Sequence, residues 1–391
     1  MHAPIRILMV VDGRYPATGG AEMQARLLSR SFASAGHEVR VLVPHLGRSL
    51  PFADQVDGIP VLRLGYPKIK GLGAILLNLN FALWLLRHQG EFDAIHIHMM
   101  HNLAGAAGWI NRWLKPTLIV KVSGAAEFQG GILDPKLMTK PVHWILRKGA
   151  QRLDAYQCIS KKTVKIMLEA GFAKERLHLL PNAVDLVRFA YKGTRDQSSL
   201  RAVFVGRHVP VKGLDVLLES WVRVSLQSPD AHLTLAGDGP ERERLMTLSR
   251  QLGIENSVSF PGLVQDVPAL LSTHNLYVQA SHQEGLPNAV LEAMANGLPT
   301  VATQISGHED VIAHSETGLL VPPNHADELA AAISHLAENP NLRQEMGATA
   351  RRFVEQYFST EAVMQSLLAV YTQPSAPLSH PMTKAKINAN R

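Results

Sequence analysis

Two glutamates, Glu284 and Glu292, lie in a run that combines a strand end with a helix start. Seven residues separate them, and the apolar stretch Leu276 to Gln279 before them predicts a buried strand. Pro287 is expected at the first position of the following helix, where its missing N–H has no partner to lose. Loops at the carboxyl ends of parallel strands bind ligands in open α/β sheets, and a helix start offers N–H groups to anions. The run therefore predicts a site for a ligand with an anionic group and hydroxyls, although a solvated helix face and a simple turn would explain the two glutamates alone.

A second loop carries two cations. The expected strand Ala202 to Val205 leads into Gly206 and Arg207, and Lys212 and Gly213 precede the next expected helix. Arginine grips phosphate oxygens with a two-pronged guanidinium and lysine adds a compact charge, so the pair suits a diphosphate. Two exposed cations on a loop are the plain alternative, which is less attractive beside the glutamate pair.

Paired glycines near the N-terminus form a weaker signal. Gly19 and Gly20 follow the first expected strand and open a helix whose apolar side is expected to carry Met23, Leu27, Leu28 and Phe32. Backbone N–H groups of glycine can approach a phosphate closely because no Cβ intervenes. The three-glycine pattern of dinucleotide-binding proteins is absent from this stretch, so a flexible turn explains the pair equally well.

Length and composition set the outer limits. The 391 residues are 46% hydrophobic and 18% charged, which is typical of a soluble protein long enough for two domains. The single cysteine, Cys158, cannot form an internal disulfide, so we expect a reducing cytoplasm and a packed side chain rather than a catalytic thiol. The start of the sequence lacks the pattern of a signal peptide. The longest apolar region, Leu72 to Leu86, falls short of the roughly twenty residues that cross a bilayer, so a packed helix is expected there.

The charge balance is basic, with a formal net charge of +6 and much of the excess in the first half. Such a face would attract anionic lipid or a phosphorylated acceptor, so peripheral contact at the inner face of the membrane stands beside the plain interpretation of solvated surface charge. Nucleic acid is not expected as a partner, because the sequence has no recognisable binding module and no basic stripe with interleaved aromatics.

Apolar runs of strand length alternate with helix-period segments along the whole chain. They are Ile5 to Val11, Val39 to Pro44, Val61 to Leu64, Ala94 to His98, Leu118 to Val122, Ala155 to Ile159 and Leu177 to Leu180, then Ala202 to Val205, Leu233 to Ala236, Val258 to Phe260, Leu276 to Gln279, Thr300 to Ala302 and Leu319 to Val321. Such alternation implies parallel strands joined by crossover helices. We therefore expect an α/β protein with two doubly wound, Rossmann-like domains.

The polar stretch from Lys192 to Ser199 interrupts this pattern and marks the junction, where a cleft is expected to open. The expected divisions are residues 1–187 for the N-terminal domain and 188–355 for the C-terminal domain. Two helical stretches follow Pro340, and the segment 356–373 is expected to form a helix that crosses back to the first domain. Residues 374–391 are rich in proline and lack an apolar period, which predicts a disordered tail.

Taken together, these motifs resemble the family 4 retaining glycosyltransferases of the GT-B fold, over about residues 5 to 371. The matching pieces are Gly206-Arg207 with Lys212-Gly213, Ala236-Gly-Asp-Gly-Pro240, the Glu284 and Glu292 pair, Thr317-Gly-Leu-Leu-Val321, and Pro181-Asn-Ala-Val-Asp185 with Ala183 in place of the family's glycine. The resemblance implies transfer of a sugar from a UDP- or GDP-sugar to a glycan or lipid-linked acceptor, in the synthesis of an envelope or extracellular polysaccharide. It also implies that the first domain takes the acceptor and the second takes the nucleotide sugar.

The resemblance assigns roles to the residues singled out above. Arg207 and Lys212 would neutralise the donor diphosphate as it becomes the leaving group, which agrees with the general action of cations on growing phosphate charge. Glu284 would hold hydroxyls of the donor sugar and Glu292 the ribose hydroxyls. The remaining donor-binding positions implied are Gly19, Gly20, Gly206, Gly285, Leu286, Pro287 and Asn288.

The acceptor side departs from the family. Many members carry a histidine before a glycine at the end of the strand Leu118 to Val122, where this chain has Ser123. Ser123, His98, His101 and Glu127 are the candidates for its role, in the regions Met99 to Gly108 and Ser123 to Gly131. No metal or other cofactor is expected, because the spacing of His96, His98 and His101 is explained as well by alternation in a half-buried strand or by substrate contact.

Two rival functions remain open from the sequence. A sugar-nucleotide epimerase or a phosphorylase of the same fold would also gather carboxylates and cations around a phosphate, and a phosphorylase would need pyridoxal phosphate on a lysine. A non-catalytic nucleotide-sugar-binding subunit is the rival from another class, since the missing histidine would be no loss to it.

Overall fold

A computed structural model describes residues 3–17, 19–46, 50–123, 125–128, 131–137, 139–191, 193 and 195–375. The chain forms two compact units, unit 1 with Met1–Ala183 and Thr360–Arg391, and unit 2 with Val184–Ser359. The predicted disordered tail lies outside the described residues from position 376 onward, as do positions 192 and 194 of the junction and positions 124, 129 and 130 of the predicted acceptor loop.

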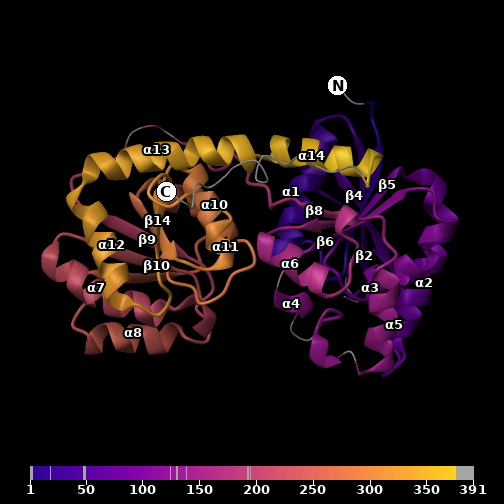
Figure 1. Ribbon diagram of the computed structural model, residues 1–391, viewed down its shortest axis with the longest axis horizontal. Coiled ribbons are helices and arrows are strands. Elements are labelled where there is room, and N and C mark those ends of the chain that lie inside the picture. The colour runs from indigo at the N-terminus through magenta and orange to yellow at the C-terminus, as the bar shows by residue number, and fades with distance from the viewer. Residues whose placement is uncertain are drawn as a thin grey trace. The chain divides into compact units, whose positions relative to one another are not determined.

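Unit 1 contains an eight-stranded sheet in the order β3-β4-β2-β1-β5-β6-β7-β8 (Figure 1). Its strands are β1 (Arg6–Val11), β2 (Glu38–Pro44), β3 (Ala53–Val56), β4 (Ile59–Leu64), β5 (Ala94–His98), β6 (Thr117–Val122), β7 (Ala155–Cys158) and β8 (Leu177–Leu179). Neighbours run parallel except β3, which pairs antiparallel with β4. The short, polar β3 was not predicted, because a mostly exposed edge strand has no apolar alternation.

Helices cover both faces of this sheet. One face packs against α2 (Gly73–His88), α3 (Asn102–Ile110), α5 (Pro141–Ala150) and α6 (Lys161–Glu169). The other packs against α1 (Gly20–Ser34) and α14 (Thr360–Thr372). A short helix, α4 (Ala125–Phe128), follows β6. On α1, Leu28 and Phe32 are buried as predicted and Leu27 is partly buried. Met23 is exposed, because the buried side of the helix includes Gln24, Ala25 and Ser29 instead.

Unit 2 contains a six-stranded parallel sheet in the order β11-β10-β9-β12-β13-β14. Its strands are β9 (Arg201–Val205), β10 (His232–Ala236), β11 (Val258–Gly262), β12 (Leu276–Gln279), β13 (Thr300–Thr303) and β14 (Gly318–Val321). Every strand predicted in this half is present within two residues of its expected ends. The apolar runs were informative here because a parallel sheet covered on both faces needs side chains that are apolar on both.

The helices of unit 2 are α7 (Leu214–Gln227), α8 (Arg242–Gln251), α9 (Val267–Ser272), α10 (Asn288–Ala295), α11 (Ser306–Glu309), α12 (Ala326–Glu338) and α13 (Pro340–Tyr357). A single core joins α7, α8 and α12 to the sheet, with the buried Trp221 in it. Helix α10 contacts β12 and β13, and α13 packs on α10. None of the described helices is both long and apolar enough to span a bilayer.

Both sheets have a point where the strand order reverses, because the second strand lies on one side of the first and a later strand lies on the other. In unit 2 this point lies between β9 and β12, and in unit 1 between β1 and β5. In doubly wound folds the connections after such strands lead away from each other, and ligands bind at the carboxyl edge between them. The loops at these two points are therefore the places to examine for chemistry.

Candidate functional site

In unit 2 the loop after β9 lies directly against the loop after β12. The Val211 carbonyl accepts a 2.8 Å hydrogen bond from the His282 N–H. Gly213 lies in the left-handed region with φ at 59°, and a Cβ there would be 2.2 Å from the Ala280 carbonyl oxygen. Only glycine fits both this conformation and this contact. The close approach brings Lys212 beside the carboxylate of Glu284.

The Glu284 carboxylate is held on one side by three donors. Its Oε1 accepts hydrogen bonds from Lys212 Nζ at 2.6 Å, Gln279 Nε2 at 2.6 Å and Ser281 Oγ at 2.7 Å. The buried Tyr277 hydroxyl donates in turn to Gln279 Oε1 at 3.1 Å, which fixes the amide so that its NH₂ group points at the carboxylate. In the described part of the chain all of these donors meet Oε1, so Oε2 is left to accept from a ligand.

The two predicted cations behave differently. Lys212 is part of the cluster, since its side chain is half-buried against Glu284. Arg207 follows β9 on the same loop and is exposed, and its guanidinium makes no hydrogen bond to the described residues. An exposed guanidinium beside a fixed ammonium can turn toward a phosphate, whereas the ammonium is already positioned.

Glu292 lies on α10 and has no hydrogen bond from the described residues to its carboxylate. Burial raises its pKa to about 7, against the opposing effect of Arg188. Both Glu284 and Glu292 raise the pKa of the buried Tyr277 hydroxyl, after the larger effect of burial, so both carboxylates lie near this ring. The structure thus brings the two predicted glutamates near the same tyrosine hydroxyl.

The start of α10 differs by one position from the prediction. Pro287 is the residue before the helix, with extended backbone, and its carbonyl accepts from the N–H groups of Val290 and Leu291. Pro287 thus has the position of the N-cap, whose carbonyl accepts the first hydrogen bonds of the helix, and the helix itself begins at Asn288. The backbone N–H groups of Gly285 and Leu286 donate to no acceptor among the described residues, so they can serve an anion.

Two residues that the sequence analysis did not single out support this loop. The Thr303 hydroxyl, at the end of β13, donates to the Ser281 carbonyl at 2.5 Å, and His308 Nδ1 lies 2.7 Å from the Thr303 carbonyl. His308 is fully buried, which lowers its pKa. The charge of Glu284 raises this pKa and the charge of Lys212 lowers it, so both side chains lie near the ring. A Cβ on Gly307 would be 2.8 Å from that of Glu284, so α11 packs on the loop. No simple sequence signal predicts these contacts, because they depend on the register of β13 beside β12.

The glycines after β9 and β10 are also in close contact. A Cβ on Gly237, where φ is 135°, would be 1.8 Å from the Gly206 carbonyl oxygen. Gly206 itself donates to the Ala236 carbonyl at 3.0 Å. Gly206 therefore serves to seat the Arg207 loop against the neighbouring strand, and its predicted contact with a ligand stays a prediction.

Unit 1 places a row of buried polar side chains at the carboxyl end of its sheet. His98 lies opposite Lys121 in the paired strands β5 and β6, and the rings of His96 and His98 are stacked at 4.5 Å. The strand was predicted to be half-buried, but β5 is buried throughout because helices cover both faces. Burial lowers the pKa of Lys121 to about 7, and both ring nitrogens of His98 and the Lys121 ammonium lack protein partners among the described residues.

His101 lies near two carboxylates at the reversal point of unit 1. Glu127 accepts from the Ser123 N–H at 2.9 Å, and Asp12 accepts from the Leu103 N–H at 3.3 Å. Burial raises the pKa of each carboxyl, and the nearby His101 opposes the rise in both. The structure thus joins three of the four predicted acceptor-side residues, Ser123, Glu127 and His101, and adds Asp12, while His98 belongs to the neighbouring row with Lys121.

Gly19 and Gly20 lie at the start of α1, as predicted, with Gly19 as the residue before the helix. The Glu22 carboxylate folds back over this position, so that a Cβ on Gly19 would be 2.2 Å from its Oε2. A phosphate at this helix start would face that carboxylate. The predicted contact of the two glycines with a donor phosphate therefore requires the Glu22 side chain to move.

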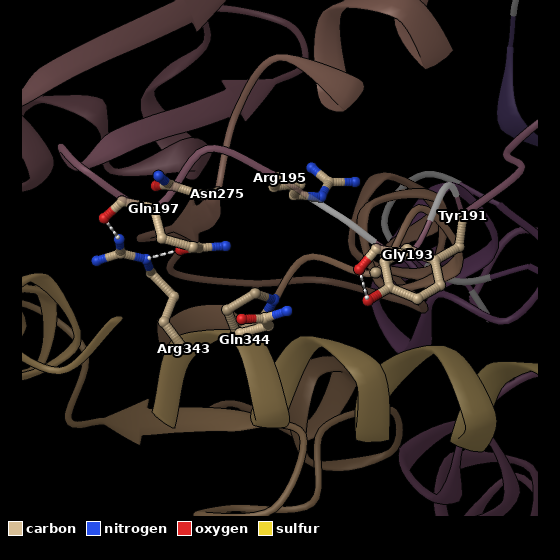
Figure 2. Close-up of a pocket in the computed structure, with 9 residues that line it drawn as sticks. Tyr191, Gly193, Arg195, Gln197, Asn275, Arg343 and Gln344 are labelled. Carbon is tan, nitrogen blue, oxygen red and sulfur yellow. Dashed lines mark hydrogen bonds between the residues drawn. The ribbon is translucent and has the colours of Figure 1, made fainter. Parts of the chain in front are cut away.

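A small polar pocket elsewhere in unit 2 is structural (Figure 2). The buried Arg343 donates to the side chain of Gln197 at 2.8 Å and to its carbonyl at 3.0 Å. Arg195 donates to carbonyls of Leu271, His274 and Asn296. These guanidiniums donate to backbone oxygens at strand and helix ends, so they tie the segment before β9 to unit 2. Among the described residues no group of three or more His, Cys, Asp or Glu side chains is arranged to hold a metal ion.

Comparison with known proteins places both halves of the chain. The family description "Glycosyltransferase Family 4" matches residues 18–188, and "Glycosyl transferases group 1" matches residues 191–353. The chain is 30% identical over 314 residues to the alpha-D-kanosaminyltransferase of Streptomyces kanamyceticus, covering 74% of this chain and 81% of that protein. It is 37% identical over 154 residues to an uncharacterized glycosyltransferase of Haemophilus influenzae, covering 39% of this chain and 44% of that protein.

The fold is found in solved structures. Anabaena HepE in complex with UDP superposes with a TM-score of 0.76 at 20% identity, over 94% of this chain and 100% of that one. This likeness supports the GT-B fold with its two parallel-sheet α/β domains. The matches to both halves, with the identity to the kanosaminyltransferase over most of its length, show that the chain belongs to the family 4 glycosyltransferases of the GT-B fold.

Proposed function

We propose that the chain transfers a sugar from a nucleotide diphosphate sugar to a hydroxyl of a glycan or lipid-linked acceptor, with retention of anomeric configuration. The observation that supports this most directly is the Glu284 carboxylate, which three donors hold by Oε1 at the reversal point of the unit 2 sheet. A carboxylate fixed in this way presents Oε2 as an acceptor for sugar hydroxyls, and it cannot turn away from them. Family membership makes this proposal more specific than the geometry alone would.

The cations fit the charge that develops on the donor. One N–H of the Lys212 ammonium is used by Glu284, so two remain for oxygens of a diphosphate. Arg207 adds a guanidinium whose fork matches phosphate geometry. We propose that these two side chains, with the N–H groups of Gly285 and Leu286, stabilise the leaving diphosphate in place of a metal ion. Turnover that persists in excess EDTA would support this assignment, and its loss would contradict it.

Glu292 suits the ribose of the donor. A carboxyl with a pKa of about 7 can accept from one hydroxyl and donate to another, according to its protonation state. Its place on the first turns of α10 sets it beside the loop that carries Glu284. UDP is the first nucleotide to test, because the structurally similar HepE was solved with UDP.

The acceptor side is proposed to lie in unit 1, at the cluster of Asp12, His101, Ser123 and Glu127. If the leaving phosphate takes the acceptor proton, retention needs no strong base in this unit, which agrees with serine at the position of the family's histidine. His101, which lies near both carboxylates, would then orient an acceptor hydroxyl. An envelope or extracellular polysaccharide is the proposed product class.

The test is release of UDP or GDP from a panel of nucleotide sugars with and without an acceptor extract. Wild type should release nucleotide only with acceptor, and Glu284→Gln should release it about 10²–10³-fold more slowly with an unchanged thermal melt. Glu338→Gln, an exposed position at the end of α12, is the matched control. Nucleotide-sugar binding without release from any wild-type reaction would instead indicate a non-catalytic binding subunit.

A further inference from the structure

Helix α2 of unit 1 is apolar on the side that faces solvent as well as on the side that faces the core. Leu77, Phe81 and Leu85 are buried against the sheet. The apolar strip, which we define as Leu72, Ile75, Leu79 and Leu83, is 51%, 49%, 56% and 50% exposed. At about 100° per residue the strip lies opposite the buried positions. The sequence predicts a packed helix here, and in the structure only one side of the helix is packed.

Such a strip is unusual on a water-exposed surface. Scattered apolar residues are normal, but four in one row on a helix mark a surface that is covered by something else. No charged residue lies within α2 before Arg87. The side chains therefore favour an apolar or interfacial surrounding over water.

The charged residues closest to the strip in the sequence are basic. Lys68 and Lys70 precede α2 and Arg87 ends it, and the sequence from Gly65 to Gly90 contains no Asp or Glu. A second apolar and basic surface lies on α5, which packs against α3 and covers the same sheet face as α2. On α5, Val142, Trp144 and Ile145 are exposed, and Lys140 and Lys148 flank them.

A hollow beside α5 combines an indole with two cations. It is lined by Trp144, Arg147, Lys148, Gln151, Ala170 and Gly171. Tryptophan prefers the boundary between lipid headgroups and acyl chains, and lysine stems extend along apolar surface while their ammonium groups reach phosphates. The hollow is thus suited to a phosphate headgroup at that boundary.

We propose that unit 1 binds an anionic membrane surface through the apolar strip of α2, with Lys68 and Lys70 on lipid phosphates and the α5 surface as a second contact. Helices with an apolar face and basic flanks lie in the plane of the interface and bind anionic lipid more tightly than neutral lipid. A second copy of the chain fits this surface less well. Two α2 helices packed face to face would bring Lys68, Lys70 and Arg87 together without a carboxylate from this segment to offset them.

The experiment is co-sedimentation of the full chain with vesicles of phosphatidylcholine alone or with added phosphatidylglycerol, in the absence of any sugar nucleotide. It is therefore independent of the proposed transfer reaction. Wild type should bind the vesicles that contain phosphatidylglycerol and dissociate at high salt. Leu79→Glu with Leu83→Glu should weaken binding on the order of tenfold or more. Lys68→Gln and Lys70→Gln should each weaken it about fivefold and reduce the dependence on salt.

Leu226→Glu and Leu263→Glu are the matched controls, since both leucines are exposed on unit 2. They should leave vesicle binding unchanged. Light scattering after gel filtration measures the molar mass of wild type and of each variant, and so shows whether the protein is a monomer or a dimer. The proposal is overturned if wild type binds neither kind of vesicle, if the strip variants bind as wild type does, or if wild type is a dimer that these variants convert to monomer without a change in lipid binding.

Discussion

Glu292→Gln tests the environment of the second glutamate. The pKa of this carboxyl is about 7 in the folded protein against an ordinary 4.5, so between these pH values the folded state holds a proton that the unfolded state has released. Stability must then fall as pH rises from about 4.5 to 7 and remain lower above that. The full difference of about 2.5 pKa units corresponds to at most about 3.5 kcal/mol, at about 1.4 kcal/mol per pKa unit. Because the side chain is partly exposed, we expect about 1–2 kcal/mol.

Glutamine keeps the shape of the side chain and cannot ionise, so the variant lacks this pH dependence. Urea unfolding of both proteins at pH 5, 6, 7 and 8 gives the difference in unfolding free energy at each pH, in which contributions from other groups cancel. The variant should gain about 1–2 kcal/mol relative to wild type between pH 5 and pH 8. A difference that stays within about 0.5 kcal/mol, as for an ordinary surface substitution, would refute the burial argument. For the control Glu338→Gln, the difference in unfolding free energy from wild type should not change with pH.

Three further substitutions test the contacts that position the site. Lys212→Met should lower the rate of nucleotide release at saturating donor by about 10²-fold or more, because it removes the ammonium from Glu284 and from the diphosphate. An unchanged rate would show that Lys212 does not stabilise the leaving diphosphate. Gly213→Ala should lower unfolding free energy by about 1–3 kcal/mol, since its Cβ would collide with the Ala280 carbonyl, and a wild-type urea midpoint would contradict this. Thr303→Val should cost about 1–3 kcal/mol by leaving the Ser281 carbonyl without its donor, and thermal melts without a shift would count against the contact.

The fold was largely predictable because both sheets are parallel, apart from the edge strand β3, and are covered on both faces. Continuous apolar runs such as Leu233 to Ala236 then mark strands directly, and the strand ends were found to within one or two residues. The same reasoning failed for β3, whose residues are polar and exposed on the sheet edge. It also missed the exposed half of α2, because an apolar helix that is packed on one side has the same sequence pattern as one packed all round.

The site was predictable only in part. The sequence pattern marked Glu284, Glu292 and Lys212 by their places after strands and at helix starts. In the structure the Lys212 ammonium donates directly to the Glu284 carboxylate. Gln279, Thr303 and His308 were missed as supports because their contacts arise from strand register and from the packing of α11. Lys121 offered an unused signal, since a charged residue inside an otherwise apolar strand requires an explanation.

The proposed roles of the two glutamates are that Glu284 holds the donor sugar and Glu292 holds the ribose. Calorimetric titration of a nucleoside diphosphate and of its sugar derivative tests these roles most directly. Wild type should bind UDP-sugar or GDP-sugar more tightly than the free nucleotide. Glu284→Gln should remove most of that difference while leaving free-nucleotide affinity within about twofold, and Glu292→Gln should weaken both ligands alike by about 1–3 kcal/mol. If either variant binds both ligands as wild type does, its carboxylate does not hold the donor and the proposed site is wrong.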